Sequence, residues 1–219
     1  MEADTPAVTT LARAPDRRAR RRQETIEEIL DIATDVMTAE GVNGLSLAEV
    51  ARRLGVRPPS LYKYFPSLHA VYDALFLRGS RAHLAVLRDA MAGAEPGLPA
   101  LTCGLEASGR WALGNRALAE LLFMRPVPSF EPSPEAFAVA EEMVALQREA
   151  LADAAEAGQL GPGARAEDAV YLVSILIAGV LSQAIANEPD RPWGEGRFSS
   201  QLPRLMRLLP AAFPPAGGS

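Results

Sequence analysis

The stretch SLAEVARRLGVRPPSLYKYF at residues 46–65 has the pattern of two short helices that meet at a tight turn. Its first half carries four apolar residues at helical spacing: Leu47, Val50, Ala51 and Leu54. This spacing places them on one face of a helix. Ser46 precedes that helix as a candidate N-cap, and Glu49 completes a capping-box pattern three residues later. Gly55 follows as the residue type that most easily ends a helix in the left-handed conformation.

The second half of the stretch predicts a short helix that presents polar and aromatic side chains outward. Pro58 and Pro59 fit the first turn of a helix, where their missing N–H groups cost no hydrogen bond. The residues expected to face the core are Val56, Leu61 and Phe65. Those expected to stay exposed and to contact another molecule are Ser60, Tyr62, Lys63 and Tyr64. We interpret the pattern as a helix-turn-helix whose second helix enters a DNA groove. A helical hairpin buried in a bundle is the alternative that short apolar patterns leave open.

A basic run lies upstream of this motif. Residues 13–22 carry six arginines against one aspartate, a net charge of +5, whereas the whole chain carries −5 and the remainder therefore −10. Such a run is typical of a disordered arm that follows a phosphate backbone, although a tail that only aids solubility has the same composition. The charge asymmetry favours a DNA-binding end and an acidic end that avoids DNA.

Several function classes find no support in the composition. No window approaches 18 uninterrupted apolar residues, and the polar N-terminus lacks the apolar core of a secretory signal, so we expect a cytoplasmic protein with no membrane partner. Cys103 is the single cysteine, and the two histidines, His69 and His83, have no metal-ligand spacing. We therefore expect neither an enzyme nor a cofactor. A module that uses its basic arm on membranes or RNA stays as an alternative, although it leaves the hairpin unexplained.

Helical periodicity persists along the chain and predicts an all-α protein. The expected helices cover 25–40, 68–91, 101–113, 117–123, 135–157, 166–187 and 198–209, with a proline-rich loop at 125–134. The expected domains are a disordered basic arm at 1–21, a helix-turn-helix domain at 22–68, an effector-binding and dimerisation domain at 69–212 and a disordered tail at 213–219. The helix at 166–187 is apolar nearly all round, so it needs cover on both sides. A second copy of the chain would supply that cover, and the core helix of a monomeric bundle is the alternative.

The N-terminal pattern resembles the TetR family of bacterial transcription regulators over residues 22–78. The residues that carry the resemblance are Ile29, Ala33, Met37, Gly41, Leu47, Val50, Ala51, Leu54, Gly55, Val56, Leu61, Tyr62, Tyr64 and Phe65. The resemblance implies an all-helical homodimer whose larger C-terminal domain binds a small ligand and releases DNA. Two features depart from the family pattern, because Leu68 stands where many members have a phosphate-binding lysine and the double proline is unusual.

These observations define three candidate sites. The expected DNA contacts are Arg20, Arg21, Arg22, Ser46, Arg57, Pro58, Ser60, Tyr62, Lys63, Tyr64 and His69. The resemblance places an effector pocket among the middle helices, where the candidates are Arg110, Trp111, Asn115, Phe123, Met124, Phe130, Phe137, Met143, Tyr171 and Ile175. The expected dimer interface contains Ile175, Ala178, Gly179, Ser182, Leu205 and Leu208. We expect a ligand-responsive repressor that binds a palindromic operator and is released by a small apolar or aromatic effector. The alternatives are an activator of the same fold, or a helical small-molecule binding protein or enzyme that does not act on DNA.

Overall fold

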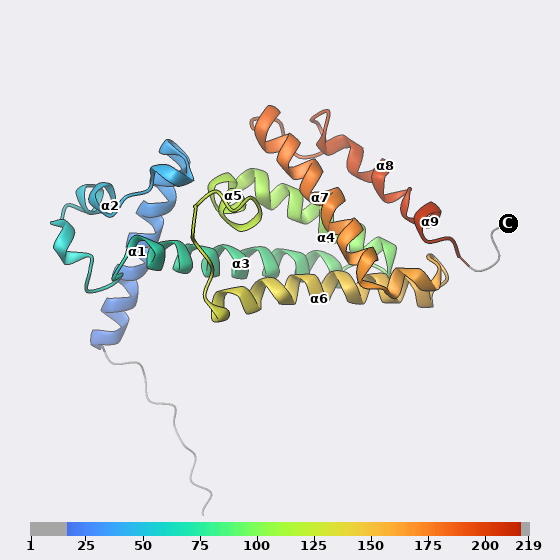
Figure 1. Ribbon diagram of the computed structural model, residues 1–219, viewed down its shortest axis with the longest axis horizontal. Coiled ribbons are helices and arrows are strands. Elements are labelled where there is room, and N and C mark those ends of the chain that lie inside the picture. The colour runs from blue at the N-terminus through green and yellow to red at the C-terminus, as the bar shows by residue number, and fades with distance from the viewer. Residues whose placement is uncertain (1–16, 216–219) are drawn as a thin grey trace, which may run out of the picture.

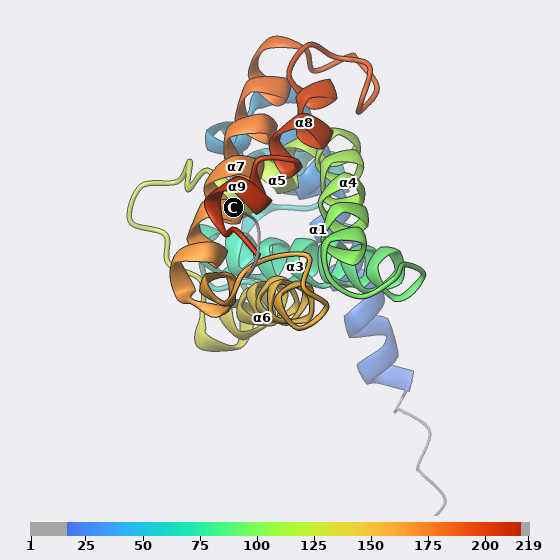
Figure 2. The same cartoon turned by 90° about the vertical axis from the view of Figure 1, so that its right-hand side faces the viewer.

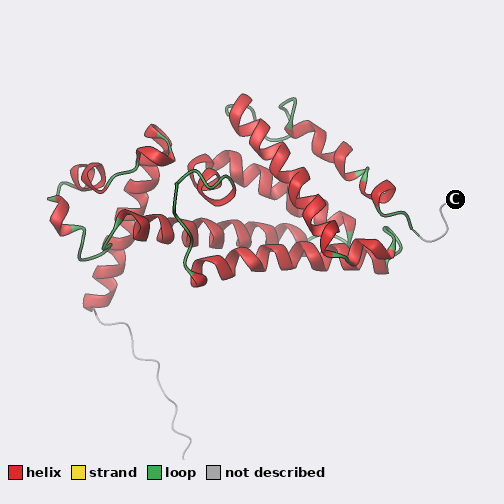
Figure 3. Cartoon of the chain, in the orientation of Figure 1, coloured by secondary structure: helices red, strands yellow, loops and turns green. Residues whose placement is uncertain are grey.

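The computed structural model describes residues 17–215, so most of the predicted basic arm and the last four residues of the predicted tail lie outside the described part. Within that part the chain is helical and contains no strand (Figures 1 and 3), which confirms the all-α prediction. The α-helices are α1 (Arg17–Glu40), α2 (Leu47–Leu54), α3 (Leu68–Ala92), α4 (Leu98–Gly114), α5 (Arg116–Phe123), α6 (Pro134–Glu156), α7 (Glu167–Asn187), α8 (Leu202–Met206) and α9 (Leu209–Ala212). Short 3₁₀ helices are η1 (Val42–Gly44), η2 (Pro58–Ser60), η3 (Pro162–Arg165) and η4 (Ser199–Gln201).

Helix α1 begins eight residues earlier than the sequence predicted. The expected start was Thr25, but the helix begins at Arg17, so residues 17–21 are helical where a disordered arm was expected. Arginine is a good helix former, and the run is continuous with the amphipathic part of the helix. Its arginines are therefore presented from a helix.

Helix α2 begins and ends at the capping residues that the sequence predicted, although Glu49 does not complete the predicted capping box. The Ser46 hydroxyl accepts a hydrogen bond from the Glu49 backbone N–H, and Gly55 ends the helix with φ of 73° in the left-handed region. Val50 and Leu61 are fully buried, as expected, and Phe65 is buried beside them. Together with Ile29, Ala33 and Met37 of α1 they form the core of the N-terminal domain.

Two details of the hairpin differ from the prediction. Val56 is exposed rather than buried, because the chain leaves the core directly after Gly55. The second helix is a 3₁₀ turn at η2 followed by hydrogen-bonded turns through Tyr64, and the Phe65 N–H bonds to the Leu61 carbonyl at 2.9 Å. Prolines at 58 and 59 remove two N–H donors from the first turn. The segment at 57–65 is called the recognition segment below.

Helix α3 connects the two halves of the molecule. Its 25 residues span about 37 Å at the usual helical rise, and Ser67 caps its start by accepting from the Ala70 N–H. The first turns pack against α1, and the rest runs alongside α4 and α6 (Figure 1). Figure 2 looks along α3 and shows α6 beneath it, with α4 and α7 on opposite sides. Helix α3 therefore contacts both halves of the molecule.

The C-terminal helices agree with the predicted order, except at the end of the chain. The helix predicted at 198–209 is divided into η4, α8 and α9, with Pro203 and Pro210 in the first turns of α8 and α9. Helix α7 is long and apolar enough, by length and composition alone, to cross a membrane, which the sequence analysis did not anticipate. One side of α7 packs against α4, α6 and α8, as expected for the core helix of a folded domain.

Candidate DNA-binding surface and ligand cavity

The recognition segment presents the side chains that the sequence assigned to DNA. Tyr62 is 54% exposed, and Arg57, Pro58 and Lys63 are exposed beside it, while Ser60 and Tyr64 are half-buried. Leu61 and Phe65 hold the segment on the core of α1 and α2 through their buried side chains. An exposed tyrosine among cations is suited to phosphate and base-edge contacts in a groove.

Tyr64 joins the start of α1 to the recognition segment. The Arg22 guanidinium lies 5.1 Å and the Lys63 ammonium 4.9 Å from the centre of the Tyr64 ring. Arg22 also donates from Nη1 to the Lys63 carbonyl at 3.2 Å. Two cations are thus held on one aromatic ring by cation–π attraction. Arg20 and Arg21 precede Arg22 on the same exposed helical end, so the predicted basic contacts lie beside the recognition segment.

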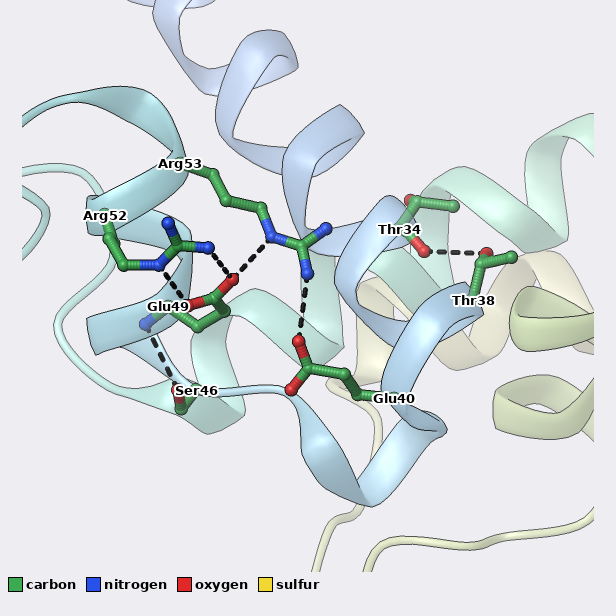
Figure 4. A network of polar contacts seen from close by, with 7 residues as sticks. All are labelled: Thr34, Thr38, Glu40, Ser46, Glu49, Arg52 and Arg53. Carbon is green, nitrogen blue, oxygen red and sulfur yellow. Dashed lines mark hydrogen bonds and ion pairs between the residues drawn. The ribbon is translucent and has the colours of Figure 1, made fainter.

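Two further arginines near the surface are already paired. Both Arg52 and Arg53 bind the Glu49 carboxylate with N–O distances of 2.6–2.7 Å, and Arg53 also binds Glu40 at 2.9 Å (Figure 4). Hydrogen bonds from Arg52 and then Arg53 lower the pKa of Glu49 to about 2. This network ties α2 to the end of α1 and carries no net charge. The Glu49 carboxylate therefore accepts hydrogen bonds from these arginines and does not make the reciprocal hydrogen bond of a capping box.

The start of α3 completes the surface. His69 is exposed in the first turn, with its ring 6.1 Å from the Phe130 ring in an edge-on arrangement. Unbonded N–H groups at a helix start can donate hydrogen bonds to a phosphate oxygen, so this turn is suited to hold a phosphate. Ser46 is half-buried and its hydroxyl is engaged in the α2 cap, so its role in this structure is structural.

Tyr72 links α3 to the DNA-binding half. Its buried hydroxyl donates to the Val42 carbonyl in η1 at 2.7 Å, and burial raises the pKa of this phenol, so it stays protonated as a donor. Asp31 of α1 and Arg78 of α3 form an ion pair across the same junction. Phe130, from the proline-rich loop, packs against Tyr72 and Phe76. The N-terminal half of α3 is thus fixed to the DNA-binding half on one side and to the proline-rich loop on the other.

A cavity of about 320 Å³ opens among α3, α4, α5, α6 and α7. Its lining residues are Phe76, Ser80, His83, Leu87, Leu105, Ser108, Leu122, Phe123, Ala140, Met143, Val144, Gln147, Ser174, Ile177, Ala178 and Leu181. Most are apolar and none is a lysine, arginine, aspartate or glutamate. Such a concave apolar site with a few polar groups is the usual form of a small-molecule pocket.

His83 occupies the buried end of this cavity. Its Nε2 lies 2.8 Å from the Ser108 hydroxyl and its Nδ1 lies 2.9 Å from the Met143 sulfur. Sulfur can only accept, so the Nδ1–H tautomer fits, with Ser108 donating to Nε2. Burial lowers the pKa of His83 to about 4, which keeps the ring neutral at physiological pH. The Trp111 and Phe123 rings lie 4.8 Å and 5.3 Å from it.

Of the ten residues predicted for the pocket, two line the cavity, one lies beside it and the others lie elsewhere. Phe123 and Met143 line the cavity, and Trp111 lies behind His83. Phe130 packs on α3 outside it, Arg110 pairs with Glu106, and Asn115 donates to the Trp111 carbonyl. Four others are exposed away from the lining: Met124, Phe137, Tyr171 and Ile175.

The sequence analysis missed the polar residues of the cavity. Ser80, His83 and Leu87 lie at i, i+3 and i+7 on α3, which places two polar side chains within its apolar face. That spacing is the signal that could have identified them. Gln147 and Ser174 form a further pair in the lining, with their side chains 3.3 Å apart.

The outer face of α7 carries the residues predicted for a dimer. Tyr171 and Ile175 are 60% and 67% exposed, and Ala178, Gly179 and Ser182 continue the same exposed stripe. A Cβ added at Gly179 would meet nothing within 4 Å, so the surface there is open and flat. Leu208 is exposed and Leu205 half-buried near the end of the chain. Ala178 also borders the cavity, which brings the two predicted sites together on α7.

Comparison with known proteins agrees with this geometry. Residues 29–75 match the model of bacterial regulatory proteins of the tetR family. The chain is 45% identical over 51 residues to YobS, an uncharacterised HTH-type transcriptional regulator of Bacillus subtilis (strain 168); the match covers 23% of this chain and 27% of that protein. The matched part is thus about a quarter of that relative. These matches coincide with the helix-turn-helix described above, and the N-terminal domain belongs to the TetR family.

The rest of the chain shares its fold with solved regulators. A tetR-family regulatory protein from Rhodococcus RHA1 superposes with a TM-score of 0.66 at 20% identity, covering 88% of this chain and 98% of that one. FadR from Bacillus subtilis, solved in complex with stearoyl-CoA, superposes with a TM-score of 0.69 at 14% identity, covering 84% and 96%. At these identities the likeness concerns the fold. It extends the TetR architecture over both halves of the molecule.

Proposed function

We infer that the chain is a ligand-responsive transcriptional regulator that binds a palindromic operator as a homodimer. In this proposal it acts as a repressor in the cytoplasm, and a small effector releases it from DNA. The family of the N-terminal domain supports the DNA-binding part. The cavity in the C-terminal half supports the effector part.

The observation that carries the proposal is the course of α3. One end of this helix is fixed to the DNA-binding half by Tyr72 and Arg78, and its middle places Ser80 and His83 in the cavity. A ligand that moves the cavity walls would displace α3, and α3 would carry the displacement to the recognition segment. Such coupling needs only that the ligand bind one position of α3 better than the other.

The exposed stripe on α7 supports the homodimer. A large exposed apolar patch on a folded protein marks an interaction surface, and small residues at its centre allow two helices to approach closely. A symmetric dimer would hold two recognition segments about one DNA turn apart, on the order of 34 Å, and would favour a palindrome. Movement of α3 would then change their separation, so that both half-sites could not be contacted together.

The cavity favours a small apolar or aromatic effector over a large charged one. FadR was solved with stearoyl-CoA, a ligand with several phosphate charges. The cavity of this chain is about 320 Å³ and its lining contains no arginine or lysine. An anionic ligand buried there would lack a compensating charge, which is costly.

The experiment is a fluorescence anisotropy titration of the purified chain on DNA that flanks its own gene. Shuffled DNA of equal length and composition, at the same stated salt concentration, is the control. We expect binding to the flanking DNA at least about 10³-fold tighter than to the shuffled DNA, the lower end for specific binders. Equal affinity for both would contradict a sequence-reading regulator.

A further inference from the structure

The cavity lining includes three deeply buried polar side chains among buried apolar ones, Gln147 and Ser174 are half-buried, and the exposed members of the lining are apolar. Ser80, His83 and Ser108 are 0%, 4% and 4% exposed, whereas Phe123, Val144 and Ala178 at the rim are exposed. A molecule that enters between α5, α6 and α7 would therefore bring its leading end to Ser80 and Ser108. Its trailing part would lie against apolar side chains.

Ser80 supplies the key observation. Its hydroxyl lines the cavity, is fully buried and has no hydrogen-bond partner. A buried hydroxyl without a partner is unfavourable, and polar groups in native interiors nearly always have one. Other buried side-chain donors and acceptors in the described part of the chain are satisfied by that same criterion. The exception lies in a ligand-sized cavity, which indicates that the missing partner belongs to a bound molecule.

The second polar group has a defined direction. Ser108 donates its proton to Nε2 of His83 in the tautomer that Met143 selects, so its remaining oxygen lone pairs are free to accept. Ser80 can donate. A ligand hydroxyl both donates and accepts, so its chemistry matches a donating Ser80 and an accepting Ser108. A carbonyl oxygen could only accept and would leave Ser108 without a donor.

Size and charge restrict the ligand further. A 150 Å³ apolar cavity admits benzene, so about 320 Å³ suits a molecule with the bulk of roughly two fused rings. The lining holds no lysine, arginine, aspartate or glutamate, and His83 is neutral because burial lowers its pKa. A carboxylate or an ammonium group would therefore be buried without a counter-charge.

We propose that the cavity binds an uncharged, largely apolar molecule of about two rings, whose hydroxyl group is held by Ser80 and by the His83–Ser108 pair. This assignment rests on the proposed function, because it names the chemical class of that regulator's effector. Ser80 and Ser108 are the specificity-determining residues, and the rim residues supply apolar contact.

Three matched probes test the assignment with the full chain at neutral pH. Naphthalene has the bulk alone, 2-naphthol adds one uncharged hydroxyl, and 2-naphthoate replaces it with a carboxylate. Dissociation constants are measured by titration calorimetry or by probe fluorescence. We expect 2-naphthol to bind up to about tenfold more tightly than either of the others, since one satisfied buried hydrogen bond is worth up to about a factor of ten.

Two variants connect the preference to the named residues. Ser80→Ala and Ser108→Ala should each weaken 2-naphthol binding by about 5- to 10-fold and leave naphthalene binding unchanged. Ser200→Ala, which removes an exposed hydroxyl on η4, is the matched control and should change neither. Because Ser80→Ala removes an unpaired buried hydroxyl, the variant should fold as well as the parent, and thermal melting verifies this.

The outcomes separate the two proposals. The ligand assignment is overturned if naphthalene or 2-naphthoate binds as well as 2-naphthol, if both variants retain the preference, or if none of the probes binds up to its solubility. Probe binding with the predicted preference but without specific DNA binding would overturn the proposed function and leave the cavity assignment standing. Specific DNA binding with no preference for the hydroxyl probe would overturn the ligand assignment and leave the proposed function standing.

Discussion

One aromatic ring, that of Tyr64, holds two cations of the proposed DNA-binding surface, Arg22 and Lys63, in a fixed arrangement. Tyr64 is half-buried against the core, and the two cations lie on its ring about 5 Å from its centre. Lys63 is the only lysine of the chain, and it remains exposed. Arg52 and Arg53, although near in sequence, are engaged with Glu49. The proposed phosphate contact therefore falls to Lys63 and the α1 arginines.

Lys63→Ala should weaken DNA binding to all sequences by a similar factor. Each lost phosphate contact lowers the slope of log K against log salt by about 1 per chain. Anisotropy titrations at several salt concentrations measure that slope. Arg88→Ala is the matched control, because Arg88 pairs with Glu142 far along α3 and its loss should leave the slope unchanged. An unaltered slope in Lys63→Ala would remove this residue from the interface.

His83 makes stability depend on pH in a defined direction. Its pKa is about 4 in the folded chain and 6.5 in its ordinary state, so the unfolded chain takes up a proton first as pH falls. Its contribution is complete above pH 6.5, decreases as pH falls toward 4 and then levels off. Between pH 7.5 and 5 the loss should be about 2 kcal/mol.

Urea unfolding at both pH values tests this, with His83→Gln against the parent chain. The variant should lose most of the pH dependence in this window. His69→Gln, at an exposed position, is the control and should retain it. The same dependence in all three proteins would mean that His83 is not protected from protonation.

At the scale of elements, α3 depends on one buried hydrogen bond at its junction with η1. Removing the Tyr72 hydroxyl would leave the buried Val42 carbonyl with only the longer, 3.4 Å hydrogen bond from the Leu45 N–H. Tyr72→Phe should therefore cost about 1–2 kcal/mol of unfolding free energy. Tyr62→Phe, which removes an exposed hydroxyl on the recognition segment, should cost close to nothing. Denaturant unfolding of both variants compares them directly, and equal stabilities would show that the junction does not depend on this bond.

Helix boundaries were predictable where local chemistry specifies them. Ser46 and Gly55 are capping residues whose role follows from their own side chain or lack of one, and both cap α2 as expected. The start of α1 was missed because a run of arginines is compatible with both a disordered arm and a helix. The recognition segment begins with a 3₁₀ turn, and apolar spacing over so few residues does not distinguish this geometry from an α-helix.

The cavity was only partly predictable for a different reason. Periodicity identifies which side of a helix is buried, but a void depends on how five helices fit together. The pattern therefore suggested Phe123 and Met143 along with large residues that lie elsewhere, such as Tyr171. It gave no weight to Ser80, which is notable for its missing hydrogen-bond partner, or to His83, which is notable for its place in the cavity lining. Small polar residues within an apolar face are the better sequence signal.

At the scale of the whole molecule, α3 joins the N-terminal domain to the helical domain that holds the cavity, and α7 is the proposed contact to a second copy. Ile175 is the most exposed large apolar residue on that face. A carboxylate at this position would be tolerated by the isolated chain and would be buried without a partner in a dimer. Ile175→Glu therefore separates folding from assembly.

The most direct test is to measure how many chains bind one operator and whether both half-sites are needed. Analytical ultracentrifugation with the operator duplex, and anisotropy on full and single half-sites at fixed salt, provide both quantities. The account predicts two chains per duplex and an affinity for the full site at least about 100-fold above that for one half-site, an advantage that Ile175→Glu abolishes. One chain per duplex, or equal affinity for the full and half-sites, would contradict it.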